Sequence, residues 1–101
     1  MNALGDWRQI DRFVHTLHLR HPGSVKVYTG ILLRFHRFVG NRTTGEPPSQ
    51  ASIRAWLDAR RREWPVHLVH HRARLVDRFL EWQVASRAIP TNPFAEWRRQ
   101  Y

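Results

Sequence analysis

Apolar residues recur at spacings of three and four along almost the whole chain, and this spacing is the feature that most restricts the fold. An α-helix returns to the same face about every 3.6 residues, whereas a strand alternates between two faces. No segment alternates over a useful length, so the pattern predicts an all-α fold without strands. The expected architecture is a compact four-helix bundle with a short C-terminal fifth helix, with helices at about 6–20, 24–39, 49–62, 65–86 and 93–99.

Capping and helix-breaking residues mark the expected ends of these helices. Asp6 and Ser24 are suited to cap the first two helices, and either Ser49 or Ser52 the third, because a short side-chain oxygen accepts from the unpaired N–H groups of a first turn. Asn92 is expected to cap the fifth. The remaining signals are Pro22-Gly23 at the end of the first helix, Gly40-Asn41 at the end of the second, Pro65 in the first turn of the fourth, and Pro93 at the start of the fifth.

Each helix has an apolar stripe that is expected to face a common core. A chain of 101 residues forms one domain, which buries about two-thirds of the surface exposed by its unfolded state. The predicted core residues are Trp7, Ile10, Phe13, Val14 and Leu17, then Val27, Tyr28, Ile31, Leu32, Phe35 and Phe38, then Ile53, Trp56 and Leu57, then Leu68, Val69, Ala73, Leu75, Val76, Phe79, Leu80 and Trp82, with Phe94 and Trp97 folding back from the end.

The charge balance indicates an anionic partner. Seventeen Lys and Arg against eight Asp and Glu give a net charge of +9, which favours polyanions such as nucleic acid or an anionic membrane surface. A membrane-surface function is disfavoured, because the apolar residues already have core positions and leave no insertion face. Trp64, between an arginine run and Pro65, is the one tryptophan expected to be exposed.

Several other classes of protein are excluded or disfavoured. The absence of cysteine excludes disulfides, cysteine-ligated zinc and cysteine nucleophiles. No apolar run approaches about 20 residues and the N-terminus lacks a secretory signal, so a soluble cytoplasmic protein is expected. The pair His15 and His18 and the group His67, His70 and His71 have helical ligand spacing, but no carboxylate shares their face. We therefore expect no metal and no cofactor.

Two helices carry polar faces rich in cations. Gly30 lies within the first of these faces, where it costs about 1 kcal/mol relative to alanine but permits close approach of another backbone, from a packed helix or from a DNA strand. Acidic Asp77 and Glu81 join the second face only towards its C-terminal end. The first face holds Lys26, Thr29, Gly30, Leu33 and Arg37, and the second holds His67, His70, His71, Arg74 and Arg78.

Four segments, taken in order, resemble one known domain. The helix at 75–82 leads into Ile89-Pro90-Thr91-Asn92-Pro93-Phe94, which closely resembles the exit turn of the core-binding domain of tyrosine recombinases and phage integrases. The segment 24–38, with its Ser start and its Ile-x-x-x-Phe-x-x-Phe ladder, is similar to the second helix of that family, and 49–57 to the third. The resemblance runs from about Trp7 to Trp97, and it implies a SAM-like bundle.

In that family the helical domain lies on one face of duplex DNA while a separate catalytic domain grips the other. The resemblance implies the same role here, in support of site-specific recombination or integration, with the second and fourth helices facing the DNA. Val27 and Ile31 depart from the threonine and tyrosine that the family often has, and Ser24 and Thr29 are candidates to replace the missing hydroxyl. The implied DNA-binding residues are Ser24, Lys26, Thr29, Gly30, Arg37, His67, His70, His71, Arg74 and Arg78, with Lys26 and Arg74 the first candidates for base contacts.

The catalytic signature of the family is absent from this chain. Its arginine, histidine-x-x-arginine and nucleophilic tyrosine belong to a second domain, and Tyr101 lacks such surroundings. We therefore do not expect an enzyme. The implied partners are double-stranded DNA, a catalytic domain of the same parent protein and neighbouring recombinase protomers, in a bacterial, archaeal or phage-encoded system. The alternative is a SAM-like helical module that binds an acidic protein partner.

Overall fold

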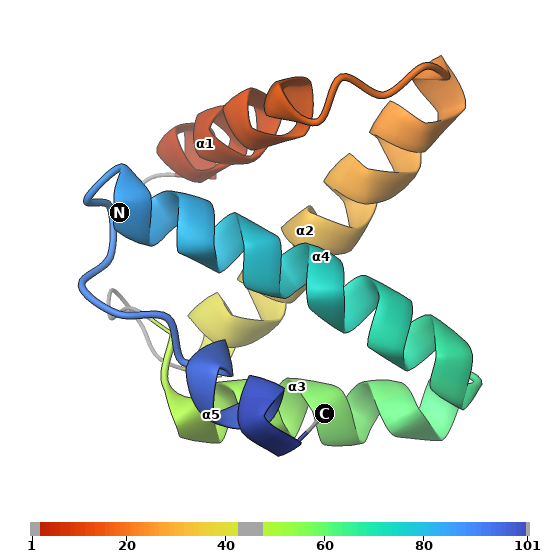
Figure 1. Ribbon diagram of the computed structural model, residues 1–101, viewed down its shortest axis with the longest axis vertical. Coiled ribbons are helices and arrows are strands. Elements are labelled where there is room, and N and C mark those ends of the chain that lie inside the picture. Colours follow the sequence, from red (N-terminus) through yellow and green to blue (C-terminus); the bar gives the residue numbers. More distant parts are fainter. Residues whose placement is uncertain (1–2, 43–47, 101) are drawn as a thin grey trace.

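The computed structural model of the protein describes residues 3–42 and 48–100, with side chains described over 8–40 and 48–98. These residues form five helices and no strand, which confirms the predicted all-α fold. The helices are α1 (Ala3–Thr16), α2 (Pro22–Arg42), α3 (Gln50–Glu63), α4 (Val66–Ala85) and α5 (Phe94–Gln100) (Figure 1).

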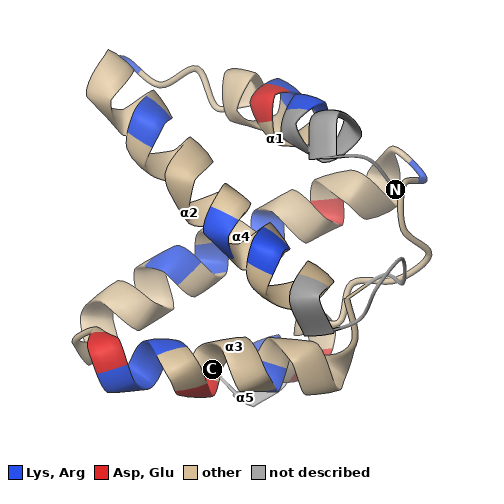
Figure 2. Cartoon of the chain, turned by 180° about the vertical axis from the view of Figure 1, so that it is seen from behind, with Lys and Arg blue, Asp and Glu red and all other residues tan. Residues whose placement is uncertain are grey.

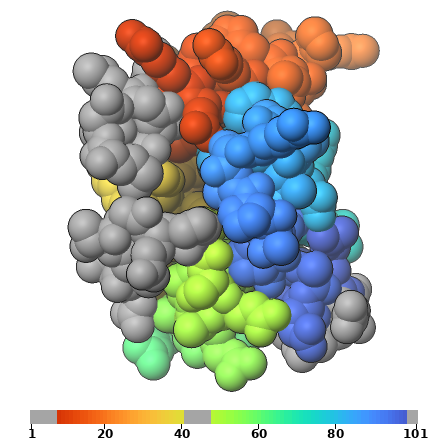
Figure 3. Space-filling view, turned by 90° about the vertical axis from the view of Figure 1, so that its left-hand side faces the viewer, coloured from red at the N-terminus to blue at the C-terminus, as the bar shows by residue number. Residues whose placement is uncertain are grey.

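The two longest helices, α2 and α4, cross at the centre of the molecule. Figure 1 shows α4 in front of α2, and the view from behind in Figure 2 shows α2 in front of α4. Helix α1 packs against both, α3 packs against both, and the short α5 lies on α3. The connection 86–93 runs down the surface between α1 and α3 (Figure 3).

A single cluster of buried side chains from all five helices forms the core. Aromatic rings meet edge-on at its centre, with centroids 5.3 Å apart for Phe35 and Trp56 and 5.4 Å apart for Phe13 and Phe79. Edge-on contact suits rings whose edges are positive and faces negative. The core comprises Ile10, Phe13, Val14, Ile31, Leu32, Phe35, Val39, Ile53, Trp56, Leu57, Val69, Ala73, Leu75, Val76, Phe79, Leu80, Ile89 and Phe94.

Both predicted ends of the first helix are wrong. Helix α1 already includes Ala3, so Asp6 lies inside the helix and does not cap it. The helix ends at Thr16, where the side-chain hydroxyl donates to the carbonyl of Phe13 at 2.6 Å, and His18 follows with a left-handed φ of 50°. Asp6 and Trp7 precede the range 8–40 over which side chains are described.

The second helix is longer than the sequence predicts. It begins at Pro22 and not after Ser24, because the N–H groups of Ser24 and Val25 already bond to the carbonyl of His21, at 3.0 and 3.4 Å. Proline suits this first turn, where its missing N–H group would have no helical partner. The helix also continues through Gly40 to Arg42, so Gly40-Asn41 is not its end. The turn-rich segment that follows falls largely on 43–47, outside the described residues.

Two caps match the prediction. Ser49 accepts from the N–H of Ser52 at 3.1 Å, and the Ser52 hydroxyl oxygen accepts from the N–H of Ser49 at 2.8 Å, which completes a reciprocal capping box on α3. At α5, the side-chain oxygen of Asn92 accepts from the N–H of Phe94 at 2.9 Å. Pro65 immediately precedes α4 and accepts from its first turn.

Two side chains differ in exposure from the prediction. Val27, expected in the core, is 52% exposed, although it lies one turn before the buried Ile31. Asp77, expected on the polar face of α4, is only 8% exposed. It is covered by the polypeptide that leads into α5, which supplies Asn92 as its hydrogen-bond partner.

Candidate nucleic-acid interface

The outer side of α2 carries a row of cations around a glycine. A rotation of about 100° per residue places Lys26, Gly30, Arg34 and Arg37 within about 80° of one another, opposite the buried side of the helix. Lys26, Arg34 and Arg37 are exposed. No Asp or Glu occurs in α2, so nothing within the helix offsets this charge. We call these four residues the α2 stripe.

Arg34 is absent from the site residues that the sequence predicts, although its spacing relative to Gly30 and Arg37 is visible in the sequence. It lies four residues after Gly30 and three before Arg37, which places it on the same side of a helix. Its exposure and its position between the two make it the central cation of the α2 stripe.

Gly30 is open to its surroundings. A Cβ atom built on it would meet nothing within 4 Å, so packing of another helix does not explain a glycine at this interior position. The same is true of Gly40, which lies nearer the C-terminal end of α2 and outside the α2 stripe. The surface at Gly30 is therefore accessible to a partner that approaches the backbone of α2.

Two of the predicted α2 residues lie away from this row. Ser24 is about 160° around the helix from Lys26 and is half-buried. Thr29 is also half-buried, at the margin of the exposed side nearer to Val25. The structure therefore brings together Lys26, Gly30 and Arg37 from the prediction, but not Ser24 or Thr29.

A second cationic row lies along α4. Four of its members are exposed and fall within about 60° of one another around the helix. The N-terminal half of α4 contains no Asp or Glu. We call this row the α4 stripe; its members are His67, His71, Arg74 and Arg78.

His70, the remaining predicted residue, is turned away from the α4 stripe towards α5. Its ring centroid lies 6.2 Å from that of Trp97, and the side chain is half-buried. Among the described residues, no group of three or more His, Cys, Asp or Glu side chains could hold a metal ion.

The two stripes lie on opposite faces of the molecule. Each stripe is on the side of its helix away from the core, and α2 and α4 cross with the core sides facing each other. The helices come together beside the crossing, where the rings of Tyr28 and His71 have centroids 6.4 Å apart. One straight duplex therefore cannot lie along both stripes.

The acidic groups of α4 are engaged with α5 and its leading segment. Arg98 binds Asp77 through Nε at 3.0 Å and also binds Glu81, while Asn92 donates to Glu81 at 3.0 Å. The hydrogen bond from Asn92 lowers the pKa of Glu81, and the hydrogen bond and charge of Arg98 lower it further, against the opposing effect of desolvation. This acidic cluster lies at the C-terminal half of α4, away from its acid-free half.

An aromatic and arginine cluster occupies the turn between α3 and α4. The guanidinium carbon of Arg72 lies 4.3 Å from the ring centroid of Trp64, and that of Arg60 lies 5.4 Å from the same centroid. Trp64 is half-buried beneath them, not exposed as predicted. Its contacts join residues from two helices, and no local pattern in the sequence signals them.

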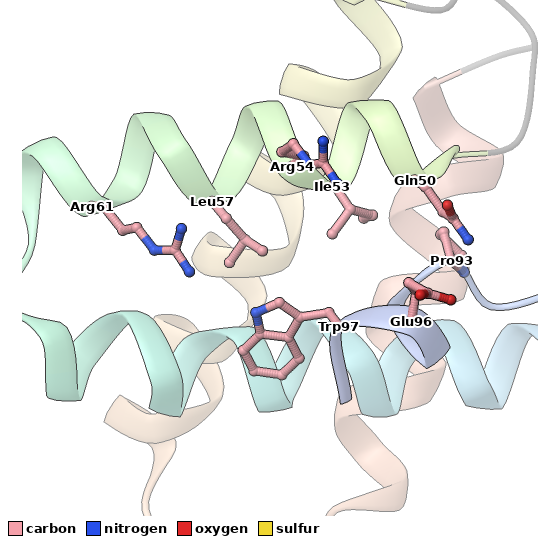
Figure 4. A pocket seen from close by; sticks show the side chains of 8 residues that line it. All are labelled: Gln50, Ile53, Arg54, Leu57, Arg61, Pro93, Glu96 and Trp97. Atoms are coloured by element: carbon pink, nitrogen blue, oxygen red, sulfur yellow. The ribbon is translucent and has the colours of Figure 1, made fainter. Parts of the chain in front are cut away.

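A hollow of about 120 Å³ lies between α3 and α5. Figure 4 shows Ile53 and Leu57 pointing from α3 towards Trp97 of α5. Arg61 and the carboxylate of Glu96 stand at its rim, so this hollow lacks the purely cationic character of the α2 stripe. The other lining residues are Gln50, Arg54 and Pro93.

The fold and its surface define a small all-α domain with a basic helix face. The chain is 32% identical over 93 residues to the uncharacterized protein y4gB of Sinorhizobium fredii, an alignment that covers 92% of this chain and 65% of that protein. The chain thus spans a little less than two-thirds of the length of this relative. No family model and no solved structure matches the chain. Within the described residues, no helix has the length and apolar character needed to cross a membrane.

Proposed function

We propose that this chain binds duplex DNA as the core-binding half of a tyrosine recombinase or phage integrase clamp. In this role it supports site-specific recombination or integration and cuts no strand itself. The observation that carries the proposal is the α2 stripe, an exposed row of three cations around an open glycine on a helix without acidic residues. The net charge of +9 and the ordered resemblance of the sequence to that domain support it.

The dimensions of the α2 stripe suit the major groove. Lys26 and Arg37 are eleven residues apart, which is about 16 Å along the helix axis. The major groove is about 12 Å wide and admits an α-helix, so the two cations can reach phosphates on either side while Arg34 faces the base edges. Gly30 removes a side chain where the helix and the DNA backbone come closest.

The α4 stripe is the competing DNA surface. The resemblance implies that both helices face DNA, yet the two stripes point in opposite directions, so only one of them lies along a given straight duplex. We assign the duplex to the α2 stripe because Gly30 adds steric access to charge. The α4 stripe, with His67, His71, Arg74 and Arg78, is then available to a catalytic domain or a neighbouring protomer.

Three double variants with the same charge change test this assignment. Fluorescence anisotropy of a labelled random duplex of about 30 base pairs is measured from about 50 to about 300 mM salt. R34A/R37A removes two exposed arginines from the α2 stripe, R74A/R78A removes two from the α4 stripe, and R8A/R12A removes two from α1. Single-stranded DNA and heparin serve as competitors.

R34A/R37A is expected to weaken duplex binding, because it removes the base-edge contact of Arg34 and the phosphate contact of Arg37. The slope of log K against log salt should fall by about 0.9, the contribution of the one lost phosphate contact. R8A/R12A should bind as the wild type does. A selective effect of R74A/R78A would move the interface to α4. No duplex binding by the wild-type protein at about 50 mM salt would overturn the proposal and favour the SAM-like protein-interaction module.

A further inference from the structure

We propose that Trp64 holds Arg60 and Arg72 as a phosphate-binding site that extends the DNA-binding surface of α2 across α3 and α4. This inference rests on the proposed function. Its ligand is a backbone phosphate of the duplex bound by the α2 stripe. In this role the indole of Trp64 is not an exposed ring but the support that positions the two arginines.

The site is rigid because its aromatic floor is fixed. Trp64 packs edge-on against Trp56, with centroids 6.2 Å apart and an interplanar angle of 82°, and Trp56 is 2% exposed. The guanidinium of Arg72, 4.3 Å from the Trp64 centroid, is close enough for a cation–π interaction. Arg60 lies near Trp64 and also 5.9 Å from the Phe38 centroid on α2.

The cluster contains more positive charge than its surroundings neutralise. Arg60 has Glu63 as a carboxylate partner at 3.4 Å, three residues further along the same helix, but that glutamate side chain is 56% exposed. Solvent screening therefore weakens this ion pair. The Nε atom of Arg60 is buried without an acceptor in the described part of the chain. Among the described residues, no carboxylate lies within ion-pair distance of Arg72. Two guanidinium groups beside one indole repel each other, and a bound anion relieves this repulsion.

The cluster lies on the same side of the molecule as the α2 stripe. Arg72 is about 140° around α4 from the middle of the α4 stripe, which turns it towards α2. Phe38, which Arg60 contacts, follows Arg34 by four residues and so lies one turn further along the same side of α2. In Figure 2, some of the cationic positions of α2 and of α4 lie next to the crossing of the two helices.

The chemistry of the site selects phosphate. A guanidinium stacked on an aromatic face keeps its N–H edge directed outward, and that planar edge matches two phosphate oxygens. A lysine in the same place would supply the charge but not the paired donors or the stacking. The inference therefore concerns the arginine side chain itself and not only its charge.

The test compares R72A, R72K and the α1 control R12A in duplex anisotropy over a range of salt concentrations. Loss of a charge-assisted contact of about 1.5 kcal/mol predicts about tenfold weaker binding for R72A. The salt slope should fall by about 0.9 for R72A and remain unchanged for R12A. R72K should retain the salt slope, because it keeps the charge. Its affinity should still fall towards that of R72A, because lysine lacks the paired donors and the stacking of the guanidinium.

A second measurement reports on the site directly. The indole N–H signal of Trp64, assigned with the variant W64F, is expected to shift when a short duplex is added to the wild-type protein. The shift should be absent in R72A. This measurement needs no separate test of stability, because the indole N–H signals of the other tryptophans show in the same spectrum whether the variant is folded.

The outcomes separate the two proposals. Duplex binding that is reduced by R34A/R37A but unchanged in R72A, with no shift at Trp64, would leave the proposed function standing and overturn the phosphate site. Absence of duplex binding by the wild-type protein would overturn both. R72K with wild-type affinity would show that charge alone acts, and it would also overturn the role of the positioned guanidinium.

Discussion

The side-chain amide of Asn92 donates a 2.7 Å hydrogen bond to Oδ1 of Asp77, and this bond ties the start of α5 to the middle of α4. The same side chain accepts from the N–H of Phe94 at 2.9 Å, so one residue both caps α5 and fixes its position. Phe94, fully buried directly after this cap, fills the adjacent part of the core. The Asn-Pro-Phe sequence is thus explained by local capping together with a long-range contact.

Replacing Asn92 with alanine is expected to lower the free energy of unfolding by about 2 kcal/mol, because a cap and a hydrogen bond to a carboxylate are lost together. N92D keeps the capping oxygen but places a carboxylate beside Asp77 and Glu81, so it should also destabilise. Urea unfolding followed by circular dichroism measures both. The exposed neighbour provides the control T91A, and a loss in N92A no larger than that of T91A would contradict this account.

The pKa of Glu81, lowered first by Asn92 and then by Arg98, predicts a pH-dependent contribution to stability. A carboxyl group whose folded pKa is depressed stabilises the fold above its unfolded pKa, near 4.3, and loses that contribution as the pH falls through the folded value. The melting temperature of the wild type should exceed that of E81Q at neutral pH, and the difference should shrink in this acidic window. A difference in melting temperature that is constant with pH would argue against the linkage. The variant R98A should show a smaller difference between Glu81 and its glutamine replacement than the wild-type background does.

Local features of the sequence predict most of the fold. Helical spacing identifies all five helices, and the side chains of Ser49 and Asn92 mark two starts correctly because caps act within one turn. The start of α2 is missed because Pro22 and Ser24 both suit a first turn, and only the bonds to the His21 carbonyl distinguish them.

The candidate site is less predictable because it depends on tertiary geometry. The sequence places Lys26 and Arg74 on cationic faces, but the crossing of α2 and α4 decides that these faces point apart. Likewise, Arg72 meets Trp64 only because α4 turns back along α3 after Pro65. Neither relationship has a signature at a fixed spacing in the chain.

The end of α4 offers a stabilising substitution. Arg87 has a left-handed φ of 64°, and its N–H and that of Ala88 bond to the carbonyls of Val84 and Gln83, the pattern of a Schellman motif. Glycine adopts this conformation without a Cβ clash, so R87G is expected to raise the free energy of unfolding by about 0.5 to 1 kcal/mol. R87A retains the strain and separates it from the loss of the arginine side chain. Equal stabilities for the two variants would show that φ is not the cause.

Gly30 links stability to DNA binding, because the same open surface that tolerates a methyl group is the proposed contact. G30A should raise the free energy of unfolding by about 1 kcal/mol, since alanine favours a helix interior and a Cβ there meets nothing within 4 Å. It should at the same time weaken duplex binding if the DNA backbone approaches α2 at this residue. G40A, in the same helix and equally open, is the matched control and should add stability without loss of binding. Anisotropy measures duplex binding by the two variants, and urea unfolding measures their stability. Equal binding by G30A and G40A would mean that Gly30 is not where the DNA approaches. The reason for assigning the duplex to α2 over α4 would then be lost.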